Sequence, residues 1–88
     1  MGYVSVQVFP PPQLSQRFVT VLRQEGFGVT TVTGMGRDGE RIILFLMLKR
    51  KDAKKALNIL DEIYPNVFYN ISDATRIRGG VFPSRKGK

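Results

Sequence analysis

Two adjoining stretches decide the fold of this chain: Gly34-Met-Gly-Arg-Asp-Gly-Glu40 and Arg41-Ile-Ile-Leu-Phe-Leu-Met-Leu48. The glycines of the first stretch spell G-x-G-x-x-G, the pattern of dinucleotide sites. In those sites a helix follows the glycines and its N-terminus holds the pyrophosphate. Here the second stretch is an unbroken apolar run without a helical period. The glycines therefore predict a loop between two strands, from Gly34 to Glu40, and not a nucleotide-binding helix.

Periodicity on both sides of this loop predicts the remaining elements. Strict alternation of apolar and polar residues is typical of a half-buried strand, and i, i+4, i+7, i+8 spacing is typical of an amphipathic helix. Proline after the first strand and glycine after the first helix end those elements. The predicted strands cover Tyr3–Val8, Phe27–Thr33, Arg41–Leu48 and Val67–Ser72. A helix between the first two strands carries the apolar residues Leu14, Phe18, Val21 and Leu22. A second helix, between the last two strands, is capped by Asp52 and has a buried stripe of Ala56, Leu57, Leu60, Ile63 and Tyr64.

The order strand, helix, strand, strand, helix, strand predicts an α+β fold of the ferredoxin-like βαββαβ type. Right-handed crossovers place both helices on one face of a four-stranded antiparallel sheet, with the first and third strands central. At 88 residues the chain predicts one domain, over residues 1–78, followed by a basic, partly disordered tail over residues 79–88. A further short strand is expected around Arg76–Ile77.

The third strand is apolar on both faces, although the helices cover only one. A continuous apolar run indicates burial on both sides, so the uncovered face is expected to pack against another subunit or domain. A homo-oligomer, trimer or dimer, is the favoured prediction, and a monomer with an apolar sheet face is the alternative. The predicted interface residues are Ile42, Leu44, Phe45, Leu46 and Met47.

Composition argues against catalysis. The chain has no histidine and no cysteine, which removes the usual general base and the preferred transition-metal ligands. Its few carboxylates form no convincing catalytic pair, since Asp61 and Glu62 are adjacent on a helix and point in different directions. We therefore predict a non-enzymatic protein without cofactor or metal. No segment is apolar enough to span a bilayer, and no signal-peptide pattern opens the chain.

The net charge of +7 is concentrated in two places. One is the tail after Thr75, and the other is Lys49-Arg50-Lys51 with Lys54 and Lys55. These clusters indicate either an anionic partner or solvated surface. Nucleic-acid binding is unfavoured, because the segment Glu25 to Val32 lacks the basic and aromatic residues of the RNA-recognition signature.

A family resemblance rests on Gly26-Phe-Gly-Val-Thr, Gly34-x-Gly36-Arg37-Asp38-Gly39, Tyr64-Pro-Asn-Val-Phe68, Ile71-Ser-Asp73 and Gly79-Gly80-Val-Phe82. Together they resemble the cytoplasmic C-terminal domain of unknown function in YitT-type and related bacterial membrane proteins. The resemblance implies a cytoplasmic soluble domain that acts on a transmembrane partner. Such domains are similar to PII signalling proteins, trimers that hold ligands at clefts between subunits near a long loop. The loop of this chain is too short to be such an arm.

Together with the apolar second face of the sheet and the glycine loop beside basic residues, this resemblance implies a ligand-sensing or regulatory domain that binds a small anionic ligand at subunit clefts. Glycine amides can form an anion-binding nest, although the same residues also suit a plain hairpin turn. The predicted ligand-binding residues are Gly34, Gly36, Arg37, Asp38, Gly39, Arg76, Arg78, Gly79 and Gly80. The alternatives are a ligand-free oligomerisation module and, less favoured, a nucleic-acid-binding domain.

Overall fold

The structure, a computed structural model, describes residues 2–74 of the chain. Its elements follow one another in the predicted order. They are β1 (Tyr3–Phe9), the 3-10 turn η1 (Pro12–Leu14), α1 (Ser15–Gln24), β2 (Thr30–Gly36), β3 (Gly39–Lys49), the 3-10 turn η2 (Arg50–Asp52), α2 (Ala53–Ile63) and β4 (Phe68–Ala74). The predicted strand around Arg76–Ile77 and the predicted tail lie outside the described residues.

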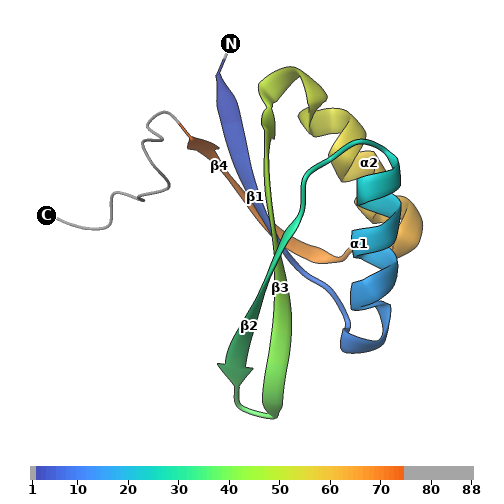
Figure 1. Cartoon of the computed structure of the whole chain (residues 1–88), viewed down its shortest axis with the longest axis vertical. Helices are drawn as coiled ribbons and strands as arrows, with labels where there is room; N and C mark the ends of the chain where they lie inside the picture. The colour runs from blue at the N-terminus through green and yellow to red at the C-terminus, as the bar shows by residue number, and fades with distance from the viewer. Residues whose placement is uncertain (1, 75–88) are drawn as a thin grey trace, which may run out of the picture.

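The four strands form one sheet in the order β2-β3-β1-β4, and every neighbouring pair is antiparallel. Both helices lie on the same face of this sheet (Figure 1). The predicted ferredoxin-like fold, with the first and third strands at the centre, is therefore confirmed.

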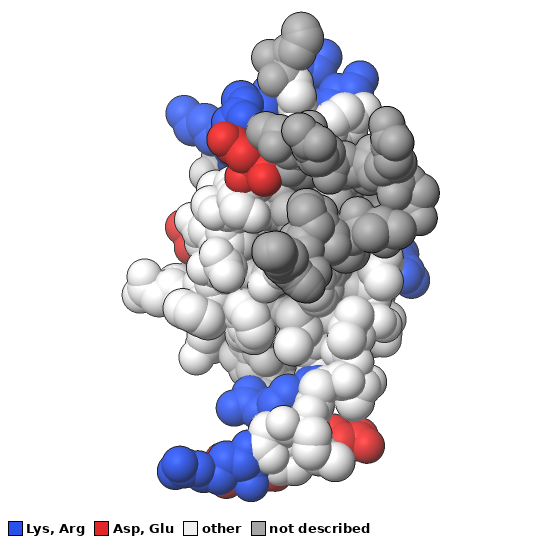
Figure 2. Space-filling model, turned by 90° about the vertical axis from the view of Figure 1, so that its left-hand side faces the viewer, with Lys and Arg blue, Asp and Glu red and all other residues white. Residues whose placement is uncertain are grey.

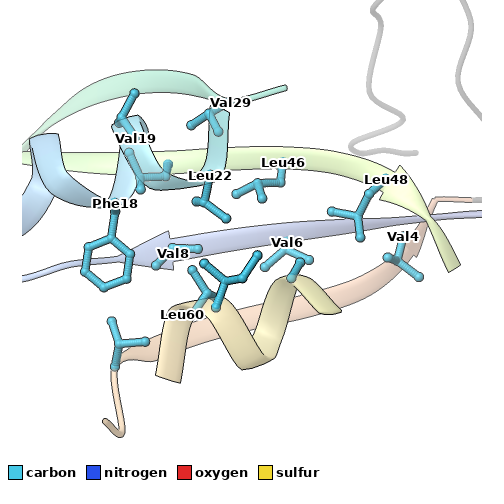
Figure 3. Packing of buried hydrophobic residues seen from close by; sticks show 14 residues of the cluster. Val4, Val6, Val8, Phe18, Val19, Leu22, Val29, Leu46, Leu48 and Leu60 are labelled. Carbon is cyan, nitrogen blue, oxygen red and sulfur yellow. The ribbon is translucent and has the colours of Figure 1, made fainter. Parts of the chain in front are cut away.

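The core lies between the helices and the two central strands (Figure 3). Val6 of β1 pairs with Leu46 of β3, and both side chains face the helices, where Phe18, Leu22 and Leu60 are fully buried. Burying an aliphatic or aromatic side chain of this size contributes about 1.5–3 kcal/mol. The core residues are Val4, Val6, Val8, Phe18, Val19, Leu22, Val29, Leu44, Leu46, Leu48, Ala56, Ile59, Leu60 and Val67.

Local sequence signals end both helices. After α1, Gly26 takes a φ of +94°, and the amides of Gly26 and Phe27 donate to the carbonyls of Arg23 and Leu22. These two bonds are the Schellman arrangement that glycine favours at a helix C-terminus. After α2, Pro65 and Asn66 form a turn in which Asn66 has a φ of +65° and the Val67 amide donates to the Tyr64 carbonyl.

The predicted Gly34–Glu40 loop is wrong. Strands β2 and β3 continue through it, and Gly36 pairs with Gly39, so that only Arg37 and Asp38 form the turn. Gly39 has a φ of +114°, whereas Arg37 and Asp38 keep negative φ, as in hairpins in which a positive-φ glycine follows a turn. The glycines before the turn sit on an edge strand, where the absence of a side chain is tolerated.

Three other predictions are also corrected. Strand β2 begins at Thr30 and not at Phe27, because the Schellman turn uses the residues after α1. In α2, Ile59 is buried, whereas the predicted stripe residue Tyr64 lies after the helix and is exposed. The interface prediction for Leu44 and Leu46 is wrong, because both side chains are buried beneath the helices of their own chain.

Candidate functional site

The predicted ligand residues do not come together within one chain. Gly34, Gly36, Arg37, Asp38 and Gly39 lie at or next to the β2–β3 turn, at the lower end of the sheet in Figure 1. The partners predicted for them, Arg76, Arg78, Gly79 and Gly80, lie outside the described residues. The described chain ends at the opposite end of the sheet, where the backbones of residue 74 and Lys49 both pair with that of Tyr3. Strand β3 spans this separation, about 30 Å at the rise of an antiparallel strand.

The hairpin turn itself is weakly suited to an anion. The cations Arg37 and Arg41 lie beside Asp38 and Glu40, so the local formal charges cancel. Gly36 and Gly39 are paired in the ladder, so they belong to a regular hairpin and not to a longer glycine loop. Among the described residues the hairpin therefore has no net charge that would attract an anion.

Cations gather at the opposite end of the sheet. Lys49, Arg50 and Lys51 follow one another where β3 ends and η2 begins, and Lys54 and Lys55 lie in the first turn of α2. We call this set of five residues the basic end. Figure 2 shows blue groups at the top of the molecule, where β3 ends, and a second blue group at the bottom, around the hairpin.

Two concavities open at the basic end. The larger one, of about 540 Å³, is lined by Gly2, Tyr3, Lys49, Arg50 and Lys51. The smaller one, of about 290 Å³, adjoins it through Tyr3 and Lys49. Its lining residues are Tyr3, Glu25, Gly26, Phe27, Gly28, Met47, Leu48, Lys49, Asp52 and Lys55. The described lining of the larger hollow has three cations and no acid, an arrangement that concentrates anions, whereas in the smaller hollow Glu25 and Asp52 balance Lys49 and Lys55.

Two of these cations form exposed ion pairs. The Nη2 atom of Arg50 lies 2.6 Å from Oδ1 of Asp73 and so joins η2 to β4, while the Arg50 amide donates to the Gly2 carbonyl at 3.1 Å. The Nζ atom of Lys55 lies 3.7 Å from Oε1 of Glu25 and 6.0 Å from the centre of the Phe27 ring. Within residues 2–74, Lys49, Lys51 and Lys54 have no acidic partner.

The sheet face away from the helices carries a third concavity. It measures about 690 Å³ and is mainly apolar, with Phe45 and Met47 of β3 beside Val32 of β2. No helix of the described chain covers this face (Figure 1). Phe45 and Met47 are therefore the predicted interface residues that remain available to a partner, whereas Ile42 is exposed on the helix side near the hairpin.

Sequence reasoning found the cations but missed the residues that complete these hollows. Tyr3 and Gly28 each line two of the three concavities, and they are far from Lys49 along the chain. Strict alternation in β1 places Tyr3 on the face opposite Val4, but only the pairing of Tyr3 with Lys49 brings it to the basic end.

The described residues contain no cluster of metal-ligand type. No three of the aspartate and glutamate side chains among residues 2–74 are gathered to hold a metal ion. Within the same residues, neither helix has the length and hydropathy needed to cross a membrane.

Comparison with known proteins gives the family. Residues 27–79 match the family described as "Uncharacterized protein conserved in bacteria (DUF2179)", which is more than half of the chain. The chain belongs to this family. A UPF0316 protein of Alkaliphilus metalliredigens is 42% identical over 88 residues, which cover 100% of this chain and 50% of that protein. The chain thus spans about half the length of the curated relatives it matches.

Solved structures agree on the fold. A DUF2179 protein from Eubacterium ventriosum has a TM-score of 0.68 at 19% identity, covering 82% of this chain and 100% of that one. Arabidopsis thaliana PII bound to citrate has a TM-score of 0.62 at 17% identity, covering 91% and 87%. At such identities the likeness concerns the fold alone. The resemblance to an uncharacterised bacterial family with a PII-like fold is confirmed, while the YitT-type membrane context and the absence of catalysis stay predictions.

Proposed function

We propose that this domain is a regulatory, ligand-sensing module that binds a small anion at its basic end. The observation that carries the proposal is the hollow of about 540 Å³ lined by Lys49, Arg50 and Lys51. Two of these cations, Lys49 and Lys51, have no acidic partner among residues 2–74. Small-molecule sites are concave and use a few convergent polar groups to fix the ligand. Tyr3 supplies the aromatic wall of the hollow.

The hairpin remains the competing site. An assembly that placed Arg37 of one copy near Arg76 and Arg78 of another would form the cleft expected from the sequence. Two features favour the basic end. Lys49 and Lys51 have no acidic partner among residues 2–74, whereas the hairpin cations lie beside Asp38 and Glu40, and the hollow exists within a single chain.

Similar proteins support a regulatory role. The structural neighbour from Arabidopsis is a PII protein bound to citrate, a small polyanion. The curated relatives are about twice as long as this chain, which leaves room for a second part that the domain would regulate. We propose that this second part is a membrane-embedded segment or partner and that the domain works on its cytoplasmic side.

Titration of the isotope-labelled chain with citrate and with inorganic phosphate, followed by amide chemical shifts, tests the site. We expect changes at Tyr3 and at Lys49 to Lys51. Replacing both Lys49 and Lys51 by alanine removes charge-assisted contacts and should weaken binding by about tenfold or more. The matched control is Arg37→Ala, which removes a cation from the hairpin. Shifts confined to Gly34–Gly39, with affinity lost in Arg37→Ala, would move the site to the hairpin.

A second candidate function is self-association through the open sheet face. Phe45 and Met47 point away from the helices and line the apolar hollow of about 690 Å³, a feature typical of interaction surfaces. A dimer or trimer formed there would make the domain an assembly module that needs no ligand. Sedimentation of the native chain against Phe45→Glu measures this. A native chain that stays monomeric at high micromolar concentration would dismiss the assembly.

Nucleic-acid binding is the least supported function. It predicts affinity that falls steeply with salt, because bound cations release counterions from the phosphate backbone. A gel shift at about 50 mM salt that shows no complex removes it.

A further inference from the structure

The three concavities adjoin one another through shared lining residues, and we call them together the groove. The two at the basic end share Tyr3 and Lys49, and the smaller of them shares Gly28 and Met47 with the apolar hollow of the open face. The groove therefore runs from Lys51 along β3 to Phe45 and Val32. Lys49 and Phe45 are four residues apart on β3, or about 13 Å at the rise of an antiparallel strand.

Strand pairing explains why the groove exists. The last pair between β2 and β3 is Thr30 with Phe45, so beyond Phe45 the edge of β3 faces the loop Gly26–Gly28 and not a strand. This loop is held by the Schellman turn after α1, by the bond of 2.9 Å from Arg23 Nη2 to the Val29 carbonyl, and by Lys55 over Phe27. A Cβ added at Gly28 would meet no heavy atom within 4 Å, so the space beside this glycine is open.

The chemistry of the groove changes along its length. At one end its walls are Lys49, Arg50 and Lys51, and at the other they are Val32, Phe45 and Met47. A purely polar anion would use only the first part. A neutral apolar molecule would leave the cations of that part without an anion. One molecule with a negative charge at one end and an apolar body could bind both parts at once.

We propose that the groove binds a free anionic amphiphile, a small molecule with one phosphate or carboxylate group and an apolar body. The anionic group lies among the cations of the basic end, and this step rests on the anion site proposed above. The apolar body passes Gly28 and Met47 and lies against Phe45 and Val32. Each methylene that the groove buries strengthens binding by about fourfold.

Octyl phosphate, inorganic phosphate and octanol are suitable probes, with octyl phosphate kept below its micelle concentration. Binding is followed by chemical shifts and calorimetry. We expect octyl phosphate to bind at least tenfold more tightly than inorganic phosphate and more tightly than octanol. Val32→Asp should remove this advantage without changing phosphate binding. The matched control is Ile71→Asp. Ile71 is 42% exposed and Val32 is 41% exposed, and both lie on edge strands, but their side chains are on opposite faces of the sheet.

Four results would overturn the proposal. Equal affinity for octyl phosphate and inorganic phosphate removes the amphiphile and leaves the anion site intact. No binding of either compound removes the anion site as well. An advantage that survives Val32→Asp, or is lost equally in Ile71→Asp, shows non-specific adsorption. A native oligomer that Val32→Asp dissociates, with no gain from the octyl chain, assigns the apolar part to a second copy.

Discussion

The substitution Leu44→Ala tests which side of β3 faces the core. Leu44 is 0% exposed and pairs with Val8 of β1 and Thr31 of β2, so its side chain lies in the closed layer beneath the helices. Its neighbour Phe45 is half-buried on the opposite face. A fully buried leucine replaced by alanine loses transfer free energy and leaves a cavity, which together cost about 2–5 kcal/mol. We expect about 3 kcal/mol for Leu44→Ala.

Urea unfolding followed by circular dichroism measures this loss, and the transition midpoint should fall while the slope stays unchanged. In a domain of this size 3 kcal/mol corresponds to a Tm lower by about 12–24 °C. The matched variant is Phe45→Ala, which should cost less than about 1.5 kcal/mol in the monomer, because its side chain already meets solvent. If Phe45→Ala costs as much as Leu44→Ala at low micromolar concentration, the assignment of faces is refuted. A cost for Phe45→Ala that grows with protein concentration would instead report self-association.

Three further substitutions test the turns and one ion pair. Gly39→Ala should lower the free energy of unfolding by about 1–3 kcal/mol, because alanine is strained at a φ of +114°. The control Gly28→Ala should change the free energy of unfolding by less than about 1 kcal/mol, because Gly28 has an ordinary φ and open space around it. Asn66→Ala should cost about 1–2 kcal/mol and Asn66→Gly should not, since the φ of +65° disfavours residues with a Cβ. Arg50→Ala should cost less than about 1 kcal/mol, because its pair with Asp73 is exposed, and a double-mutant cycle that finds a larger coupling would contradict this.

The topology was predictable because the local patterns agree with one another. Alternation in β1 and helical spacing around Phe18 and Leu60 each fix one element, and the handedness of crossovers then allows few arrangements. The hairpin boundary was not predictable in this way. Glycine is unfavourable in strands, so Gly34 and Gly36 indicated a loop, and their acceptance in an edge ladder depends on β3 as a partner.

Which side chains of β3 face the helices could not be predicted from the sequence either. An unbroken apolar run has no alternation, so nothing local distinguishes Leu44 and Leu46 from Phe45 and Met47. Register with β1 supplies the missing information, because Val6, which faces the helices, pairs with Leu46. The candidate site was hidden for the same reason. The basic residues were visible in the sequence, but Tyr3 reaches them only through the same pairing.

Strand β3 is therefore the element that gives the groove both of its chemistries. Phe45 and Met47 leave the sheet on the open face, and Lys49 continues the same alternation at the point where η2 adds Arg50 and Lys51. Phe45, Met47 and Lys49 thus lie at alternate positions of a central strand, which is paired along this length with β1 and anchored by the core beneath it. The sheet sets the spacing of the backbone positions that carry these groups, so the proposed ligand would not have to order the backbone on binding. Sites on rigid strands keep their geometry better than sites on loops. By this criterion the groove along β3 is better prepared for a ligand than the hairpin turn at Arg37 and Asp38.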